Sequence, residues 1–398
     1  MSHSESAPDA PNARSAATLA AAEQQVTSFL ADLESLVNID SGTYTPAGVA
    51  RVAETLSPRF AALGFAVETQ PGRELGPQLV ARRQGTGRVK LVIVGHMDTV
   101  FPDGEAQRRP YTLRDGRAYG PGVFDMKSGL LVGLYALRVL AEMDEAPYSE
   151  LTFICNGDEE IGSPESHDLI AATARDADVV LVLEPTSDVE RVTVARKGVG
   201  LYRLEVRGRA AHAGVEPKRG RSAIVELAHR TLALHALNGT IPGVTVNVGV
   251  VAGGERPNIV ADHATAEIDV RAADPAGVAA IHEALQRVAS DSERHVPDTE
   301  VSLTGGMRHQ PFTQSERSAQ VFALAQAEAA TQGLTLRGEP TGGASDGNTA
   351  AALGVATLDG LGPAGGLAHN PGEFISVASI APRIALLAGL LGRLGTNE

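Results

Sequence analysis

Residues 89–98 read VKLVIVGHMD, an apolar run that ends in a histidine and an aspartate two positions apart. An unbroken apolar strand is typical of the centre of a sheet that is buried on both faces. Residues 151–156 (LTFICN) and 179–183 (VVLVL) repeat the pattern, and a stretch with helical spacing of apolar residues separates the first two runs. Alternating strands and helices predict an α/β fold, with a layered main domain built on a mixed central sheet.

The pattern changes after about residue 197, where a strand of alternating polar and apolar residues begins. From residue 200 to residue 303 the expected elements follow the order β-α-β-β-α-β, which is typical of a small ferredoxin-like α+β domain. Beyond residue 311 long helices and buried strands return. We therefore expect a disordered lead-in at 1–18, a main domain formed by 19–198 and 308–398, and a domain inserted between them at 199–307.

Composition limits the classes of function that are open to this chain of 398 residues. The 34 Lys and Arg against 48 Asp and Glu give a formal charge of −14, which argues against binding of nucleic acid or of an anionic membrane. The single cysteine allows neither an intrachain disulfide nor a thiolate zinc site, so a metal would need His, Asp and Glu ligands. No transmembrane span or secretory leader is expected, which favours a cytoplasmic protein and leaves periplasmic or secreted forms open.

Acidic residues and histidines follow all three buried strands. GHMD (95–98) ends the first strand, GDEE (157–160) follows the second and EPT (184–186) follows the third. Asp125 lies in a glycine-rich turn before a helix, and His369 lies in a loop near the C-terminus. Each motif alone has an ordinary explanation as a capping residue or a solvated turn. Together they predict one site, because sites in α/β sheets lie at the carboxyl ends of strands.

The chemistry of these side chains indicates a two-metal centre. Two histidines and three carboxylates suffice for two cations with one bridging carboxylate, and ligands without thiolate suit Zn²⁺, Mn²⁺ or Co²⁺. Adjacent residues face different ways, so one of Glu159 and Glu160 can bind metal while the other handles a water. Asp98 is spaced to accept the second ring N–H of His96. Such a site would make a hydroxide near neutral pH and polarise a carbonyl.

A series of ordered motifs resembles the family of di-zinc exopeptidases and deacylases, which includes glutamate carboxypeptidase, acetylornithine deacetylase and succinyl-diaminopimelate desuccinylase. The resemblance runs from about residue 25 to the C-terminus and is strongest to glutamate carboxypeptidase. It implies a catalytic domain with an inserted lid that forms a homodimer, and two Zn²⁺ per subunit, with Co²⁺ or Mn²⁺ as substitutes. The motifs are GHMDTV (95–100), GPGVFDMKSG (120–129), GDEEIGS (157–163), LEPT (183–186), GRAAHAG (208–214), GGASDGN (342–348) and AHNPGE (368–373).

The resemblance also implies roles at the matching positions. Glu159 would be the general base, and Asp98 would orient a metal-binding histidine. His212 would reach the active site of the partner subunit and stabilise the oxyanion, and the peptide bond after Asp125 is often cis in this family. The implied metal ligands are His96 and Glu184 for one zinc, Glu160 and His369 for the other, and Asp125 as the bridge. The implied substrate-binding residues are Asn258, Arg271, Lys197, Gly343 and Ser345.

These roles imply that a hydroxide held by two metals cleaves an amide next to a free carboxylate in a small molecule, an acyl-amino acid or a peptide. A glutamate-type carboxypeptidase is the first interpretation. The alternative is an N-acyl-amino-acid deacylase of the acetylornithine deacetylase or desuccinylase type, and an allantoate-type amidohydrolase is a third. A binding module that had lost its metals would lack ligands or the base, whereas this sequence retains every one of those positions.

Overall fold

A computed structural model of the protein describes residues 10–396, and residues 1–9 and 397–398 lie outside the description. The chain divides into two compact units. Of the described residues, the main domain comprises 10–194 together with 314–340 and 345–396. The inserted domain comprises 195–313 and 341–344, so it contains the whole of the insertion predicted at 199–307.

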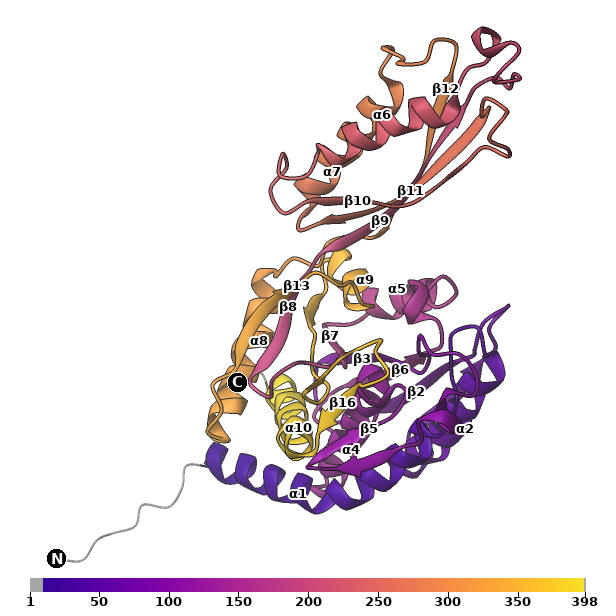
Figure 1. Cartoon of the computed structure of the whole chain (residues 1–398). Coiled ribbons are helices and arrows are strands. Elements are labelled where there is room, and N and C mark those ends of the chain that lie inside the picture. Colours follow the sequence, from indigo (N-terminus) through magenta and orange to yellow (C-terminus); the bar gives the residue numbers. More distant parts are fainter. Residues whose placement is uncertain (1–9, 397–398) are drawn as a thin grey trace, which may run out of the picture. The chain divides into compact units, whose positions relative to one another are not determined.

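A six-stranded mixed sheet forms the centre of the main domain (Figure 1). The strands β6, β3, β7 and β14 run parallel to one another, whereas β2 runs antiparallel to both β1 and β6. This arrangement confirms the predicted α/β class. In sheet order the strands are β1 (Ala66–Gln70), β2 (Gln78–Gln84), β6 (Glu150–Asn156), β3 (Lys90–His96), β7 (Val179–Val182) and β14 (Ala356–Leu358).

Both faces of this sheet are buried, as the unbroken apolar strands predict. Leu91 and Ile93 of β3 belong to the larger core cluster, whereas Val92 and Val94 belong to a second cluster on the opposite face. Successive side chains of a strand point to opposite faces, so one apolar run serves two cores. Residues of α1 (Ala10–Val37), α2 (Pro46–Ala62), α4 (Ser128–Glu142), α8 (Glu316–Thr331) and α10 (Ile380–Thr396) join the larger cluster, and residues of α5 (His167–Arg175) and α9 (Gly347–Ala352) join the second.

The first helix begins earlier than the sequence analysis predicts. Residues 10–18 belong to α1, so this part of the expected lead-in is helical; the rest of the lead-in, 1–9, lies outside the described residues. The physical reason is tertiary packing, because α1 packs against α4 and α10. Arg14 forms an ion pair with Glu145, and Thr18 is fully buried. Helix formation of this kind depends more on the packed face than on local propensity.

The segment Val377–Gly395, which includes most of α10, is long and apolar enough to span a membrane by length and composition. No such span is expected from the sequence analysis. Most of this segment is buried inside the structure, and Ile384, Leu387 and Leu391 are fully buried. Its apolar character is therefore that of a core helix.

The inserted domain has its own sheet and core. The sheet order β10-β11-β9-β12 is antiparallel throughout, and the chain order β-α-β-β-α-β is the predicted ferredoxin-like one. At the base of the domain, Arg196 and Phe312 exchange backbone hydrogen bonds of 2.9 and 3.0 Å. The elements are β9 (Gly198–Arg207), α6 (Ala223–His235), β10 (Thr245–Gly253), β11 (His263–Ala272), α7 (Pro275–Ser290) and β12 (Glu300–His309).

Shorter elements complete the chain. One small sheet has the order β15-β16-β5-β4, and β8 pairs with β13 in another. These elements are α3 (Glu105–Arg108), β4 (Thr112–Arg114), β5 (Arg117–Tyr119), β8 (Arg191–Arg196), β13 (Arg337–Thr341), β15 (Gly365–Gly366) and β16 (Phe374–Ser376). The pair of β16 with β5 matters for the site, because Phe374 follows the His369 loop directly and Tyr119 precedes the glycine-rich turn.

Candidate metal centre and active site

The carboxyl edge of the central sheet carries the residues singled out by the sequence. Strand β3 ends at His96, β6 ends just before the GDEE turn, and β7 ends two residues before Glu184. Since these three strands are parallel, their ends meet at one edge of the sheet. Asp125 comes from the turn Val123–Lys127, and its peptide bond to Met126 is cis, as the family resemblance implies.

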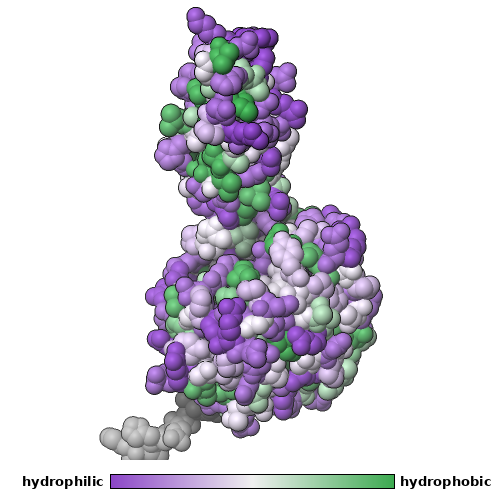
Figure 2. All heavy atoms as spheres, turned by 45° about the vertical axis from the view of Figure 1, so that its right-hand side comes forward, coloured by the Kyte–Doolittle hydropathy of each residue, from purple (hydrophilic) through white to green (hydrophobic). Residues whose placement is uncertain are grey.

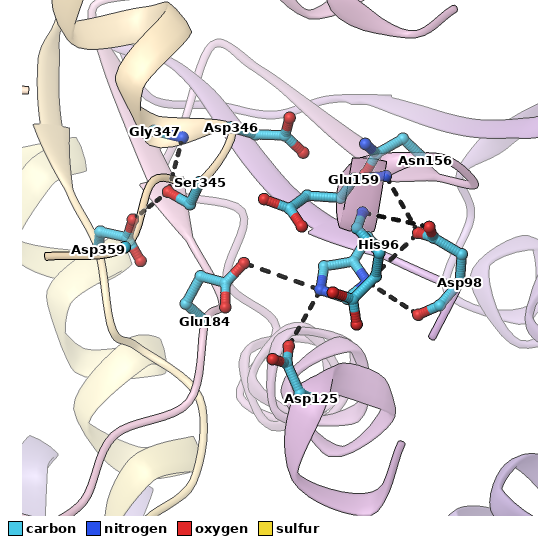
Figure 3. A network of polar contacts seen from close by, with 12 residues as sticks. His96, Asp98, Asp125, Asn156, Glu159, Glu184, Ser345, Asp346, Gly347 and Asp359 are labelled. Atoms are coloured by element: carbon cyan, nitrogen blue, oxygen red, sulfur yellow. Dashed lines mark hydrogen bonds and ion pairs between the residues drawn. The ribbon is translucent and has the colours of Figure 1, made fainter. Parts of the chain in front are cut away.

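The Asp125 carboxylate lies between two histidines. Its Oδ1 is 3.1 Å from His96 Nε2, and its Oδ2 is 3.2 Å from His369 Nε2. Glu184 Oε1 lies 3.8 Å from the same nitrogen of His96, and Glu160 Oε2 lies 3.1 Å from His369 Nε2. The five residues expected to be metal ligands therefore form one continuous cluster, and Figure 3 shows the part around His96.

The donor set of this cluster fits divalent cations. Ligand atoms of His96, Asp125 and Glu160 lie within 4.8 Å of one another, as do those of His96, Glu159 and Glu184. Glu160 Oε1 is buried and makes no hydrogen bond to the described part of the chain. Buried polar atoms without a partner are rare, and a missing ion is one ordinary explanation. Imidazole nitrogens and carboxylate oxygens are ligands that Zn²⁺ accepts.

The neighbouring carboxylates raise the pKa of both histidines of the cluster, against the effect of burial. Burial alone would lower the pKa of His96, but hydrogen bonds to Asp125 and Asp98 raise it well above the usual value. Hydrogen bonds to Asp125 and Glu160 raise the pKa of His369 to about 10. Burial would raise the pKa of Asp125, but the hydrogen bonds from His369 and His96 hold it below the usual value.

Metal binding should therefore release protons. Because the pKa of His369 is raised to about 10, this side chain is protonated at pH 7 and must lose its proton before it can bind a cation. We expect metal affinity to rise between pH 6 and pH 9 by about tenfold per unit for each proton released. Calorimetric titration of metal-free protein with Zn²⁺ in buffers of different ionisation enthalpy measures the protons released. Identical heats in all buffers would contradict the expectation.

Glu159 is placed to act beside the ligands. Its pKa is raised well above the usual value, first by burial and then by the negative charge of Glu184. Figure 3 shows its side chain extending toward the space between Glu184 and His96. The backbone N–H groups of Glu159 and Glu160 donate to the two carboxylate oxygens of Asp98 at 3.2 Å each. A carboxylate with a raised pKa in a cluster of this kind is a candidate for proton transfer.

Asp98 is fully buried and contacts His96 in two ways. His96 Nδ1 lies 3.0 Å from the backbone carbonyl of Asp98 and 3.4 Å from its carboxylate. Thr43 donates its hydroxyl to the same carboxylate at 2.7 Å, and this buried threonine was not found from the sequence. No spacing rule connects Thr43 with Asp98, because the two segments meet through tertiary contacts. The backbones of Ser41 and Thr43 bond to Thr99, and the Ser41 hydroxyl donates to the carbonyl of Met97.

Replacing Thr43 by valine should leave the fold intact and reduce kcat/KM by about 10- to 100-fold, the usual loss when a partner of a metal-ligand pair is removed. Valine keeps the shape of threonine but cannot donate to Asp98. Thr43→Ser restores the hydroxyl and should recover most of the activity. Steady-state kinetics on the two variants tests this, and equal activities of Thr43→Val and the wild type would show that Asp98 needs no such donor.

A second polar network that sequence reasoning missed lies behind the acidic turn. Ser163 donates to Asp346 at 2.5 Å, and Asn156 donates to Ser166 at 3.1 Å. Ser166 in turn donates to Asp158 at 2.5 Å. Burial raises the pKa of Asp346 to about 6. The network ties the GDEE turn to the GGASDGN turn, and only the second motif could have drawn attention to Asp346.

Two predicted substrate residues lie in the GGASDGN segment. Ser345 is fully buried, and its hydroxyl donates to Asp359 at 2.6 Å and accepts from the amide of Gly347 at 3.0 Å (Figure 3). Gly343 is exposed, and its carbonyl accepts from Arg196 at 3.3 Å. The Ser345 side chain is therefore engaged inside the fold.

The other predicted residues belong to the inserted domain. His212 is exposed, and its Nδ1 accepts from the amides of Gly214 and Val215 at 3.1 Å each, which leaves the ring proton on Nε2. The carbonyl of Asn258 accepts from the amide of Ala213 at 3.0 Å, so Asn258 and His212 lie on neighbouring segments.

Arg271 and Lys197 also lie in the inserted domain. Arg271 donates to both carboxylate oxygens of Asp269 at 2.8 and 2.9 Å. The backbone amide of Lys197 donates to Thr341 at 3.1 Å. Arg271 therefore lies in β11, whereas Lys197 lies between β8 and β9.

Residues 92–393 match Peptidase family M20/M25/M40. The chain belongs to this family. It is 31% identical over 383 residues to "Carboxypeptidase G2" of Pseudomonas sp. (strain RS-16), covering 95% of this chain and 92% of that one. It is 29% identical to "Succinyl-diaminopimelate desuccinylase" of Delftia acidovorans, covering 88% and 93%. A tripeptidase structure from Staphylococcus aureus has a TM-score of 0.80 at 26% identity, covering 93% and 99%.

Family membership agrees with the chemistry of the cluster. M20 peptidases are metal-dependent, and their relatives include both a carboxypeptidase and a desuccinylase. The protein is a metal-dependent hydrolase of amide bonds, as the sequence analysis predicts. The fold, with a catalytic domain and an inserted domain, is likewise that of the family.

Proposed function

We propose that this enzyme removes an amino acid with a free carboxylate from its acyl or peptidyl partner, in the manner of a glutamate carboxypeptidase. One observation carries the proposal: the two oxygens of Asp125 contact two different histidines, at 3.1 and 3.2 Å. A carboxylate shared in this way is the geometry expected of a bridge between two cations. The 31% identity to a carboxypeptidase favours this substrate class.

In this proposal the two cations are Zn²⁺. His96 and Glu184 would hold one, Glu160 and His369 the other, and Asp125 both. When bound, such cations polarise the scissile carbonyl and lower the pKa of a water molecule. Asp98 would fix the ring of His96 through its carbonyl and carboxylate contacts.

Glu159 would act as the general base. Its raised pKa suits a group that takes a proton from water and passes it to the leaving amine. His212, with its proton on Nε2, would donate a hydrogen bond to the oxyanion. The proposal places this histidine in the active site of a partner subunit, so it also requires a homodimer formed through the inserted domain.

The dimer is supported by apolar side chains on the inserted domain. Val250 and Val251 of the edge strand β10 and Leu232 of α6 are exposed. Figure 2 shows apolar groups between hydrophilic ones on the visible face of this domain. Association through such residues would bury them. Sedimentation of the purified protein tests the dimer.

A cytoplasmic location stays a prediction.

The substrate class is tested by a panel of acyl-glutamates, N-acetylornithine, N-succinyl-diaminopimelate and dipeptides, with ammonia release as a separate assay. Cleavage of acyl-glutamates is the expected result. Turnover of N-succinyl-diaminopimelate or N-acetylornithine alone would favour the deacylase alternative, which the 29% identity to a desuccinylase supports. Ammonia release from allantoate would indicate the third interpretation.

Arg271 is the proposed clamp for the substrate carboxylate. Arg271→Ala should raise KM by about 10- to 100-fold with a smaller change in kcat, because a hydrogen-bonded charge pair contributes about 1.5–3 kcal/mol. Arg203→Ala is the matched control, since Arg203 forms a similar half-exposed pair with Glu267 at 2.7 Å in the same sheet. An equal KM increase in both variants would contradict a specific role for Arg271.

A further inference from the structure

Glu373 is a fully buried carboxylate that the proposed function does not use. It lies four residues after His369, in the loop that leads into β16. Its Oε1 accepts a hydrogen bond from the backbone amide of Gly122, which begins the turn carrying Asp125. Its Oε2 makes no hydrogen bond to the described residues. One carboxylate therefore connects the two segments that carry Asp125 and His369.

The partner of this contact has little freedom. Gly122 has φ of 73°, a region that favours glycine, and a Cβ there would lie 2.6 Å from Thr99 Cγ2. The turn therefore requires glycine at this position, and Glu373 is the side chain that accepts from its amide. Lys127, at the other end of the same turn, is also fully buried and donates to the carbonyl of Ile39 at 2.7 Å. The turn of Asp125 is thus held at both ends.

The loop of His369 has few restraints of its own. His369 has φ of 61° and Leu367 has φ of 63°, so two residues other than glycine occupy the left-handed region. More than half of the His369 side chain is exposed. Besides short-range turn contacts, Arg109 donates to the carbonyl of Pro371 at 2.5 Å, and Glu373 binds Gly122. Together with the contacts of His369 to Asp125 and Glu160, these two contacts hold the loop against the main domain.

We propose that Glu373 is a positioning residue that fastens the His369 loop to the Asp125 turn, so that Glu160, His369 and Asp125 are set in advance to hold a cation. Arg109 assists from the surface side of the same loop. A buried carboxyl group loses its contacts with water, and the hydrogen bond from a backbone amide compensates part of that loss while it fixes the position of the loop. This inference rests on the proposed metal centre and extends it to residues that touch no cation.

The test measures cation binding by the intact protein. Metal-free wild type is titrated with Co²⁺, followed by calorimetry and by the visible absorption of the bound ion, to resolve two binding steps. In Glu373→Met, which cannot accept from Gly122, we expect the step assigned to Glu160 and His369 to weaken by about 10- to 100-fold and the other step to change less than about threefold. Glu373→Gln keeps a carbonyl acceptor, so its affinity in the step assigned to Glu160 and His369 should lie between those of Glu373→Met and the wild type.

Glu328→Met is the matched control, because Glu328 is an equally buried carboxylate bound to Arg393 at 2.7 Å in the packing of α8 and α10. It should lower the melting temperature but leave both Co²⁺ steps unchanged. The proposal would be overturned if Glu373→Met and Glu328→Met weakened both steps equally. It would also be overturned if folded Glu373→Met bound Co²⁺ in the step assigned to Glu160 and His369 as tightly as the wild type does.

A second variant decides the matter if Glu373→Met does not fold. Arg109→Ala removes the other fastening from a partly exposed position and should weaken the same step. Unchanged Co²⁺ binding in both Arg109→Ala and Glu373→Gln would reject the positioning role. Failure of the wild type to bind two cations would instead reject the proposed metal centre, so the two failures are distinguishable.

Discussion

Glu159→Gln should lower kcat by about 10²- to 10⁴-fold and leave the metal content unchanged. Glutamine has nearly the same shape but cannot accept the proton of the attacking water. The backbone amide of Glu159, which donates to Asp98, is untouched by the substitution, so the acidic turn should keep its conformation. The measurement is steady-state hydrolysis of an acyl-glutamate together with metal analysis of the same preparation.

Asp168→Asn is the control for this experiment. Asp168 lies nine residues further along the chain, and its side chain is fully exposed at the start of α5. Removing its charge should change kcat by less than about twofold, because an exposed charge is well screened. If Glu159→Gln kept most of the activity, the assignment of the general base would be wrong, and the neighbouring Glu160 would become the candidate base.

Removal of divalent cations is expected to abolish hydrolysis and to destabilise the main domain. Without cations, the cluster relies on the contacts of His96 and His369 with the carboxylates, and the pKa of His369 is raised to about 10. A ligand present at a thousand times its dissociation constant stabilises the folded state by about 4 kcal/mol. We therefore expect the melting temperature to fall after chelation and to recover when Zn²⁺ is restored.

The experiment compares chelated and dialysed protein with the same protein after addition of Zn²⁺, Co²⁺, Mn²⁺ or Ca²⁺. The imidazole ligands favour the first three over Ca²⁺, which prefers six to eight oxygen ligands. Full activity in the metal-free protein, verified by elemental analysis, would show that the cluster works without cations. Equal recovery with Ca²⁺ would show that the histidines are not ligands.

Much of this structure was predictable because the sequence patterns that indicate it lie within short stretches of the chain. The apolar run of β3 indicates burial on both faces, and the structure assigns alternate residues of that run to two cores. The ends of β3, β6 and β7 indicate a shared edge, and the five candidate ligands lie together there. The order of elements in the inserted domain follows directly from the period of its polar and apolar residues.

The residues that sequence reasoning missed act through tertiary contacts. Thr43 reaches Asp98 because the backbones of Ser41 and Thr43 bond to Thr99, and nothing in the local sequence shows that pairing. Glu373 depends on an amide that is distant in the chain. The start of α1 was likewise missed, since residues 10–18 belong to a helix that packs on α4 and α10, and the local sequence does not show this packing.

The paired backbones of Arg196 and Phe312 have a consequence for engineering. These residues exchange two hydrogen bonds where the chain enters the inserted domain and where it first leaves it, before the short return at 341–344. Cα atoms of such an antiparallel pair are about 5.5 Å apart. A short reverse turn is therefore long enough to close the gap, and each part retains its own apolar cluster. The main domain and the inserted domain are therefore natural units for separate expression and for exchange with the corresponding domains of other members of the family.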